Sequence, residues 1–235
     1  MKSDVEEYYS RRAHTYHDLD KPNTIVACVR AIGIEDHLEI IAPKPSEKIL
    51  DMGCGSGRFL KPFSIAKVYG IDFTIKMLQK AKDSGVPLVR GDVEHLPFKS
   101  NAFDIVHSAG LLGVYRSKKI LAEAARVAKK GGKMYVSFPA TPSASGVAVK
   151  LFQRFYNPAL LDYWYTKGEI KEMLPGGVIV LDIHRLGWEP PFQRIYRYVG
   201  SERLVKLFLY LERNLRDKPM FKYFRARFLL EVVKE

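Results

Sequence analysis

The chain alternates short apolar runs with amphipathic stretches, and this pattern predicts an α/β domain. Apolar runs end near residues 50, 71, 90 and 108, and most are followed by stretches with apolar residues at helical spacing. Strands separated by helices pair in parallel through right-handed crossovers. The pattern therefore predicts a mostly parallel sheet with helices on both faces.

The remaining segments extend this sheet at both ends. Residues 5–19 and 24–39 predict two N-terminal helices, and residues 118–130 predict a helix with Ser117 as its N-cap. A strand ending at Pro139, a helix over residues 166–174 and strands over residues 177–186 and 226–235 follow. A helical insertion is expected over residues 151–165. A second helix is expected over residues 202–215, with one apolar side formed by Leu204, Leu207, Phe208, Leu211 and Leu215.

A glycine-rich loop follows the first strand and predicts a nucleotide-type ligand site. Asp51 closes the strand, Gly53, Gly55 and Gly57 form the turn, and a helix is expected from about residue 56. The spacing is not the G-x-G-x-x-G pattern that binds a dinucleotide. A carboxylate at Asp51 would repel a pyrophosphate, but it suits an ammonium or sulfonium group.

A second carboxylate follows the second strand. Asp72 lies 21 residues after Asp51, about the distance at which α/β nucleotide sites place the acid that binds the ribose hydroxyls. A carboxylate accepts two hydrogen bonds from a cis-diol. Phe73 follows directly, and we expect its ring to lie against the adenine face.

These motifs resemble those of class I S-adenosylmethionine-dependent methyltransferases. DMGCGSGRFL is similar to the first motif of that family and GDVEHLPF to its third, while YYSRRAHTYHD is similar to its opening segment and departs from it at His17. The resemblance covers residues 5–139. It implies a Rossmann-like fold with a seven-stranded sheet in the order 3-2-1-4-5-7-6, with insertions after strand 5 and between strands 6 and 7.

The resemblance also implies the cofactor and its contacts. S-adenosylmethionine is the expected cofactor and S-adenosylhomocysteine the product. In the third motif, Asp92 receives the adenine amino group and the N–H of Val93 meets a ring nitrogen. The implied cofactor-binding residues are Asp51, Met52, Gly53, Gly55, Gly57, Asp72, Phe73, Asp92, Val93, Ser108 and Tyr16.

Length and composition predict one domain over residues 1–235. With 235 residues, 47% of them apolar, the chain holds a single sizeable core. We expect residues 1–42 to form a helical lid and residues 43–139 to form the cofactor-binding core. Residues 140–165 and 187–225 are expected to shape the acceptor pocket. The polar N-terminus, the absence of a long apolar run and two unpaired cysteines favour the cytoplasm.

The chemistry requires little of the protein, because a sulfonium methyl is already activated. An oxygen, nitrogen or carbon acceptor still needs a place for its proton. His95, His107 and Tyr115 lie near strand ends and are candidates for this role, as are His14 and His17 if the first helix closes over the site. The sequence identifies no partner for any of them, and it has no Cys/His cluster with metal-ligand spacing.

The net charge of +12 does not identify the methyl acceptor. Basic residues outnumber acidic ones two to one from residue 185 to the end, which suits RNA, an anionic membrane surface or solubility alone. We favour a small apolar or aromatic acceptor, as in the type 11 group that includes ubiquinone and menaquinone biosynthesis enzymes. The alternatives are an RNA methyltransferase and, from another class, an oxidoreductase or a nucleotide-binding module. The sequence does not determine the oligomeric state.

Overall fold

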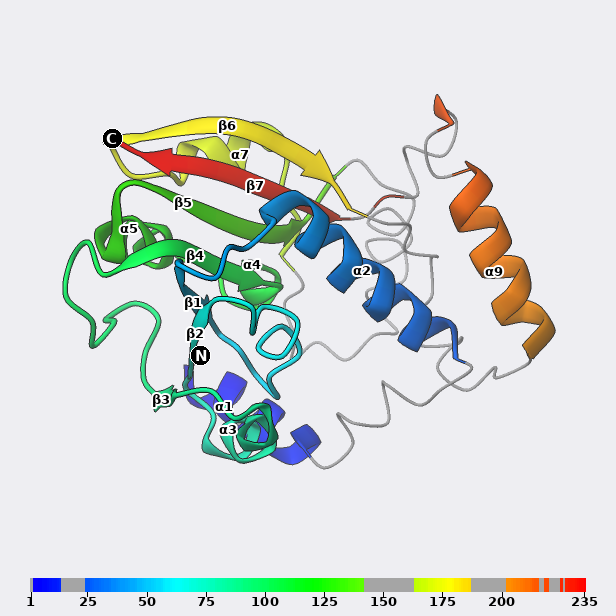
Figure 1. Ribbon diagram of the computed structural model, residues 1–235, viewed down its shortest axis with the longest axis horizontal. Helices are drawn as coiled ribbons and strands as arrows, with labels where there is room; N and C mark the ends of the chain where they lie inside the picture. The colour runs from blue at the N-terminus through cyan, green and yellow to red at the C-terminus, as the bar shows by residue number, and fades with distance from the viewer. Residues whose placement is uncertain are drawn as a thin grey trace.

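Seven strands form one sheet in the computed structural model, which describes residues 2–13, 24–141, 163–186, 202–215, 218–219, 225 and 227–235. The order is β3-β2-β1-β4-β5-β7-β6, and β7 runs antiparallel to both of its neighbours (Figure 1). This confirms the predicted fold and order. The strands are β1 (Lys48–Met52), β2 (Lys67–Asp72), β3 (Leu88–Arg90), β4 (Phe103–Ala109), β5 (Ala128–Pro139), β6 (Val178–Arg185) and β7 (Arg227–Lys234).

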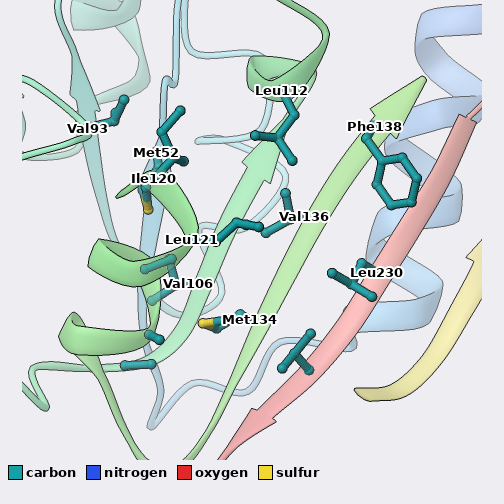
Figure 2. Packing of buried hydrophobic residues seen from close by; sticks show 14 of the residues in the cluster. Met52, Val93, Val106, Leu112, Ile120, Leu121, Met134, Val136, Phe138 and Leu230 are labelled. Atoms are coloured by element: carbon teal, nitrogen blue, oxygen red, sulfur yellow. The ribbon is translucent and has the colours of Figure 1, made fainter. Parts of the chain in front are cut away.

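Alternate residues of the central strands enter two separate cores. Leu50 and Met52 of β1 point to a core completed by α5 (Lys118–Val127) and α7 (Lys167–Glu172). Figure 2 shows part of this core, with Leu121 of α5 beside Val106 and Val136. Ile49 points to a second core, shared with α2 (Ile25–Ile41) and α3 (Ile75–Ala81), which continues into η2 (Lys82–Ser84). Both faces of the sheet are therefore covered, as a parallel sheet requires.

The segment after the glycine loop is not the predicted helix. Residues 56–66 form consecutive turns, in which most backbone bonds join residues three apart, such as the Leu60 N–H to the Gly57 carbonyl. Gly57 has φ +88°, which a right-handed helix does not allow, and Pro62 has no N–H to donate. Phe59, Leu60 and Phe63 are nevertheless buried, so the turns still cover the sheet.

The boundary between α5 and β5 also differs from the prediction. Lys129 and Lys130 were expected at the end of the helix, but β5 begins at Ala128 and includes both lysines. Ala128 is paired with Phe103 of β4, and Lys129 forms an ion pair with Asp104 at 2.6 Å. Pairing with β4 therefore overrides the local helix-ending pattern.

The two N-terminal helices contact different parts of the molecule. α1 (Lys2–Arg12) lies beside α3 (Figure 1), and Glu6 pairs with Arg90 of β3 at 3.1 Å. The predicted helical residues 14–19 lie outside the described part of the chain. α2 is capped by Thr24, and its C-terminal Ile41 packs on the sheet.

α9 (Glu202–Leu215) has the predicted bounds but a different buried face. Val205 and Phe208 pack against Ile25 and Ile32 of α2, whose N-terminal half extends beyond the sheet (Figure 1). Leu207, from the expected apolar side, is 51% exposed, and Leu204 is 39% exposed. The apolar arc of this helix is wide, and α2 covers only the part of it around Val205 and Phe208.

Much of the two insertions lies outside the described residues, including residues 142–162 and 187–201. The predicted helix over residues 151–165 falls almost entirely there. After that gap Tyr165 is extended, bridges Ala140 and donates its hydroxyl to the Leu112 carbonyl at 2.9 Å. Leu112 belongs to α4 (Leu111–Val114). None of the helices in the described ranges is long and apolar enough to cross a membrane.

Candidate cofactor site

The glycine loop turns sharply at the carboxyl end of β1 and leaves its backbone accessible. Gly53 and Cys54 both donate their N–H groups to the Ile71 carbonyl, at 2.8 and 3.0 Å, so β2 holds the loop in place. Gly55 has φ +54°, and among the described residues no atom lies within 4 Å of the position that a Cβ would take there. A ligand can therefore lie directly against this glycine.

Asp72 connects the glycine loop to the start of α3. Its Oδ2 accepts the Gly55 N–H at 2.9 Å and its Oδ1 accepts the Thr74 N–H at 2.8 Å. Each carboxylate oxygen has a second lone pair, so a ribose hydroxyl can still bind. Burial raises the pKa of Asp72, and the two backbone N–H groups oppose that shift by stabilising its charge.

An exposed aromatic ring follows Asp72. Phe73 is 37% exposed, and Arg90 of β3 donates from Nε to its carbonyl at 3.2 Å. The guanidinium carbon of Arg90 lies 6.0 Å from the centre of the Phe73 ring. Because Arg90 also pairs with Glu6, the ring is bordered by β3 and α1. The predicted adenine contact therefore lies at the strand end, with a face open to a ligand.

Asp92 and Val93 occupy the turn after β3, and a buried carboxylate follows them. Asp92 Oδ1 accepts the Glu94 N–H at 2.9 Å, and Val93 is buried. Glu94 Oε2 accepts the Tyr115 hydroxyl at 3.0 Å, and the Ser117 hydroxyl donates to Oε1. Sequence reasoning did not identify Glu94, because its two partners follow it by more than twenty residues.

Asp51 meets His107 in the interior of the protein. The residues are register partners on β1 and β4, and His107 Nδ1 lies 2.8 Å from Asp51 Oδ1. Asp51 is 2% exposed and His107 has no exposed surface. The Asp51 carboxylate therefore lies beneath the glycine loop. His107 contacts this carboxylate, and it has no exposed surface from which to reach an acceptor.

His37 of α2 belongs to the same buried group, and no sequence motif indicates this. Its ring centroid lies 5.2 Å from that of His107 and 4.7 Å from that of Phe59. Its Nδ1 is 2.5 Å from the Gly33 carbonyl oxygen. Burial, followed by the charge of His107, holds the pKa of His37 well below 6.5. His37 is therefore neutral at pH 7.

The other residues predicted for the site lie in different environments. Some are buried, one is exposed, and three lie outside the described residues. Met52 is buried in the core, and the Ser108 hydroxyl donates to the Met52 carbonyl at 3.0 Å, so this serine ties β4 to β1. His95 is exposed in the turn after β3. Tyr16, His14 and His17 lie outside the described residues. The structure brings together the glycine loop, Asp72 and Phe73, with Asp51 beneath them.

Comparison with known proteins identifies the family. A methyltransferase-domain family model matches residues 50–136, from β1 to β5. A demethylmenaquinone methyltransferase from Corynebacterium kroppenstedtii is 33% identical over 162 residues, which is 68% of this chain and 68% of that protein. The chain belongs to the S-adenosylmethionine-dependent methyltransferases. Other relatives with the same name match over less than half of their own length.

Solved structures show the same fold at low sequence identity. A methyltransferase from Thermotoga maritima has a TM-score of 0.70 and 17% identity, with 97% of this chain and 99% of that one covered. The magnesium protoporphyrin IX methyltransferase of Synechocystis, solved with bound S-adenosylhomocysteine, has a TM-score of 0.70, 16% identity and complete coverage of both chains.

The cofactor of this methyltransferase is S-adenosylmethionine, and the described residues fit it. Gly55 offers open backbone, Asp72 retains lone pairs for the ribose, and Phe73 exposes a ring beside them. Asp92 lies at the adjacent strand end.

Proposed function

We propose that this methyltransferase transfers the methyl group of S-adenosylmethionine to a small apolar or aromatic acceptor, of the type that demethylmenaquinone represents. The observation that carries the proposal is the 33% identity, over two thirds of the chain, to a protein with that name. The described structure adds apolar surface that suits such an acceptor, because α9 leaves Leu207 and Tyr210 exposed.

The cofactor would be held by groups at the ends of two strands, β2 and β3. Asp72 would bind the ribose hydroxyls, Phe73 would lie against the adenine, and Asp92 with the backbone of Val93 would bind the edge of that ring. When bound, S-adenosylmethionine supplies an activated methyl group. The protein then has to orient the acceptor in line with the S–CH₃ bond and exclude water.

We propose that Tyr115 and Glu94 take up the proton that the acceptor loses on methylation. Transfer of a methyl group to a C–H or O–H acceptor forms a bond to the methyl carbon, breaks the S–CH₃ bond and releases one proton. Tyr115 is half-buried, and its hydroxyl donates to Glu94 at 3.0 Å. As Tyr115 takes a proton from the acceptor it can pass its own to Glu94. His107 has no exposed atom for this role, and His95 lies exposed in the turn after β3.

A lipid-soluble acceptor would bring the enzyme to a membrane surface, and α9 has suitable chemistry. Leu207 is 51% exposed and Tyr210 is 63% exposed, and Arg203 and Lys206 are exposed on the same helix. Lys206 is paired with Glu202 at 2.7 Å, so Arg203 and Arg213 supply most of the net positive charge. Apolar and aromatic side chains bordered by cations favour the interface of an anionic bilayer. We place the enzyme in the cytoplasm, at such a surface.

Labelled S-adenosylmethionine tests the acceptor. We expect the label to pass to demethylmenaquinone dispersed in detergent, and to be extracted into organic solvent. Tyr115→Phe should lower kcat roughly 10²-fold or more while leaving the cofactor Kd unchanged. Transfer of the label to RNA, with none to the quinone, would contradict the proposal and favour the RNA alternative.

Vesicle flotation tests the membrane contact. The protein should float with phosphatidylglycerol vesicles and remain behind with phosphatidylcholine vesicles. Leu207→Asp should abolish flotation, whereas Ile65→Asp, at an equally exposed apolar residue in the turns after the glycine loop, should not. Equal loss in both variants would contradict a specific role for α9.

A further inference from the structure

A buried ionisable pair lies directly beneath the glycine loop. His107 Nδ1 is 2.8 Å from Asp51 Oδ1, and neither residue has appreciable exposed surface. The register of β1 and β4 places them opposite each other, so the sheet itself fixes their approach. Only Met52 separates Asp51 from Gly53. Any charge on this pair therefore lies close to the cofactor.

The surroundings of the pair are mostly apolar, so they shield its charge poorly. The His107 ring packs 4.6 Å from the Phe59 ring and 4.9 Å from the Phe63 ring, measured between centroids. Its buried Nε2 has no hydrogen-bond partner among the described residues. The Asp51 carboxylate places one negative charge under the loop. In such a poorly solvated place that charge is felt strongly nearby.

We propose that His107 is a positioning residue, which holds the Asp51 carboxylate in place under the glycine loop so that its charge selects S-adenosylmethionine over S-adenosylhomocysteine. The proposal rests on the cofactor and is independent of the acceptor. Substrate and product share the nucleoside and the amino acid, but only the substrate carries the sulfonium charge. A buried negative charge therefore favours substrate entry and weakens the hold on the product once the methyl group has left.

Two rings and two arginines near the pair keep a constant charge near neutral pH. His37 stays neutral, because burial lowers its pKa. Tyr135, the register partner of His107 on β5, also stays neutral, because burial raises its pKa to about 12. The charges of Arg58 and Arg227 also lower the pKa of His37, and both arginines remain positive.

Three variants test the proposal through the ratio of two dissociation constants. Calorimetry gives the Kd of S-adenosylhomocysteine divided by that of S-adenosylmethionine at pH 7.5. His107→Asn still presents an N–H to Asp51 and should keep the wild-type ratio. His107→Val and Asp51→Asn remove the donor and the charge, and each should reduce the ratio roughly tenfold, equivalent to about 1.4 kcal/mol. General damage to the site would weaken both ligands equally and leave the ratio unchanged.

The conservative variant separates positioning from packing. Both His107→Asn and His107→Val leave a smaller side chain in the core, but only the asparagine presents an N–H to Asp51. His184→Gln is the matched control, because His184 Nε2 also contacts a carboxylate, Glu231, at 2.8 Å, but on β6, beyond β5 and β7. It should change nothing.

Two results would overturn the proposal. One is a wild-type ratio in His107→Val or Asp51→Asn, and the other is a ratio in His107→Asn as low as in His107→Val. If His107→Val does not fold, Asp51→Asn alone decides. A wild-type protein that binds neither ligand would instead count against the methyltransferase activity itself.

Discussion

The carboxyl ends of β1 and β2 and the junction of α2 with α9 are held together in different ways. At the strand ends, Asp72 accepts backbone N–H groups from Gly55 and Thr74, and the Ile71 carbonyl accepts two more from the loop. At the helix junction, the contact is a small apolar cluster centred on Ile25, Ile32, Val205 and Phe208. Hydrogen bonds fix the first region in one geometry, while nondirectional apolar contacts form the second.

This difference suits the cofactor site and the proposed acceptor surface. A cofactor site needs atoms placed to within fractions of an ångström, and backbone groups of a sheet provide that precision. A surface that receives an apolar acceptor needs exposed apolar area and tolerates small shifts. We therefore expect mutations at the strand ends to change binding, and mutations at the helix junction to change local stability.

The largest expected effect is in the sheet itself. Phe138 of β5 is completely buried against Phe228 and Tyr165 (Figure 2 shows its position). Phe138→Ala should lower the free energy of unfolding by about 3–5 kcal/mol, through lost burial and the cavity left behind. Urea denaturation measures this. Ile65→Ala, at a residue that is 59% exposed, is the control and should stay within about 0.5 kcal/mol.

Asp72→Ala is expected to have the next largest effect, on binding rather than on the core. Loss of the ribose contacts and of the bond to Gly55 should weaken S-adenosylmethionine binding by roughly 2–4 kcal/mol. Calorimetry checks the affinity, with Asp83→Ala, an exposed aspartate in η2, as the matched control. Unchanged affinity in a folded Asp72→Ala protein would rule out the ribose assignment.

Phe208→Ala should loosen α9 while sparing the cofactor site. We expect a loss of about 1–3 kcal/mol, below the usual range for a buried phenylalanine, because the cluster around it is small. Hydrogen exchange should speed up in α9 and stay slow in β1 and β4. Leu207→Ala, on the exposed flank, is the control. Faster exchange throughout the sheet would show that the junction supports the whole fold.

The smallest effect concerns pH. Because the folded-state pKa of His37 lies well below 6.5, the unfolded chain binds a proton there more readily than the folded one. Stability should therefore fall as the pH drops below about 6.5, by at most about 1.4 kcal/mol per pH unit from this residue. His37→Phe should flatten that slope, and His95→Gln, at an exposed histidine, should not. An unchanged slope in His37→Phe would contradict the assignment.

Local sequence determined the sheet and most of the cofactor edge of this protein. Strand and helix periodicity predicted the seven strands, and the positions of Asp72 and Phe73 predicted two groups at one strand end. These predictions succeed because neighbouring parallel strands end at the same edge, so spacing along the chain becomes proximity in space. The turns at residues 56–66 were missed because Gly57 and Pro62 prevent a helix that the burial pattern otherwise favours.

Only the tertiary structure decided which distant side chains share a buried environment. Asp51 and His107 are 56 positions apart, and His37 arrives on a helix from outside the motif. The buried face of α9 was likewise set by α2, because a helix with a wide apolar arc can pack on more than one face. Periodicity reports that a side chain can be buried. Which partner that side chain meets depends on the element that packs against it. The same element decides which hydrogen bonds the side chain makes and whether it is exposed.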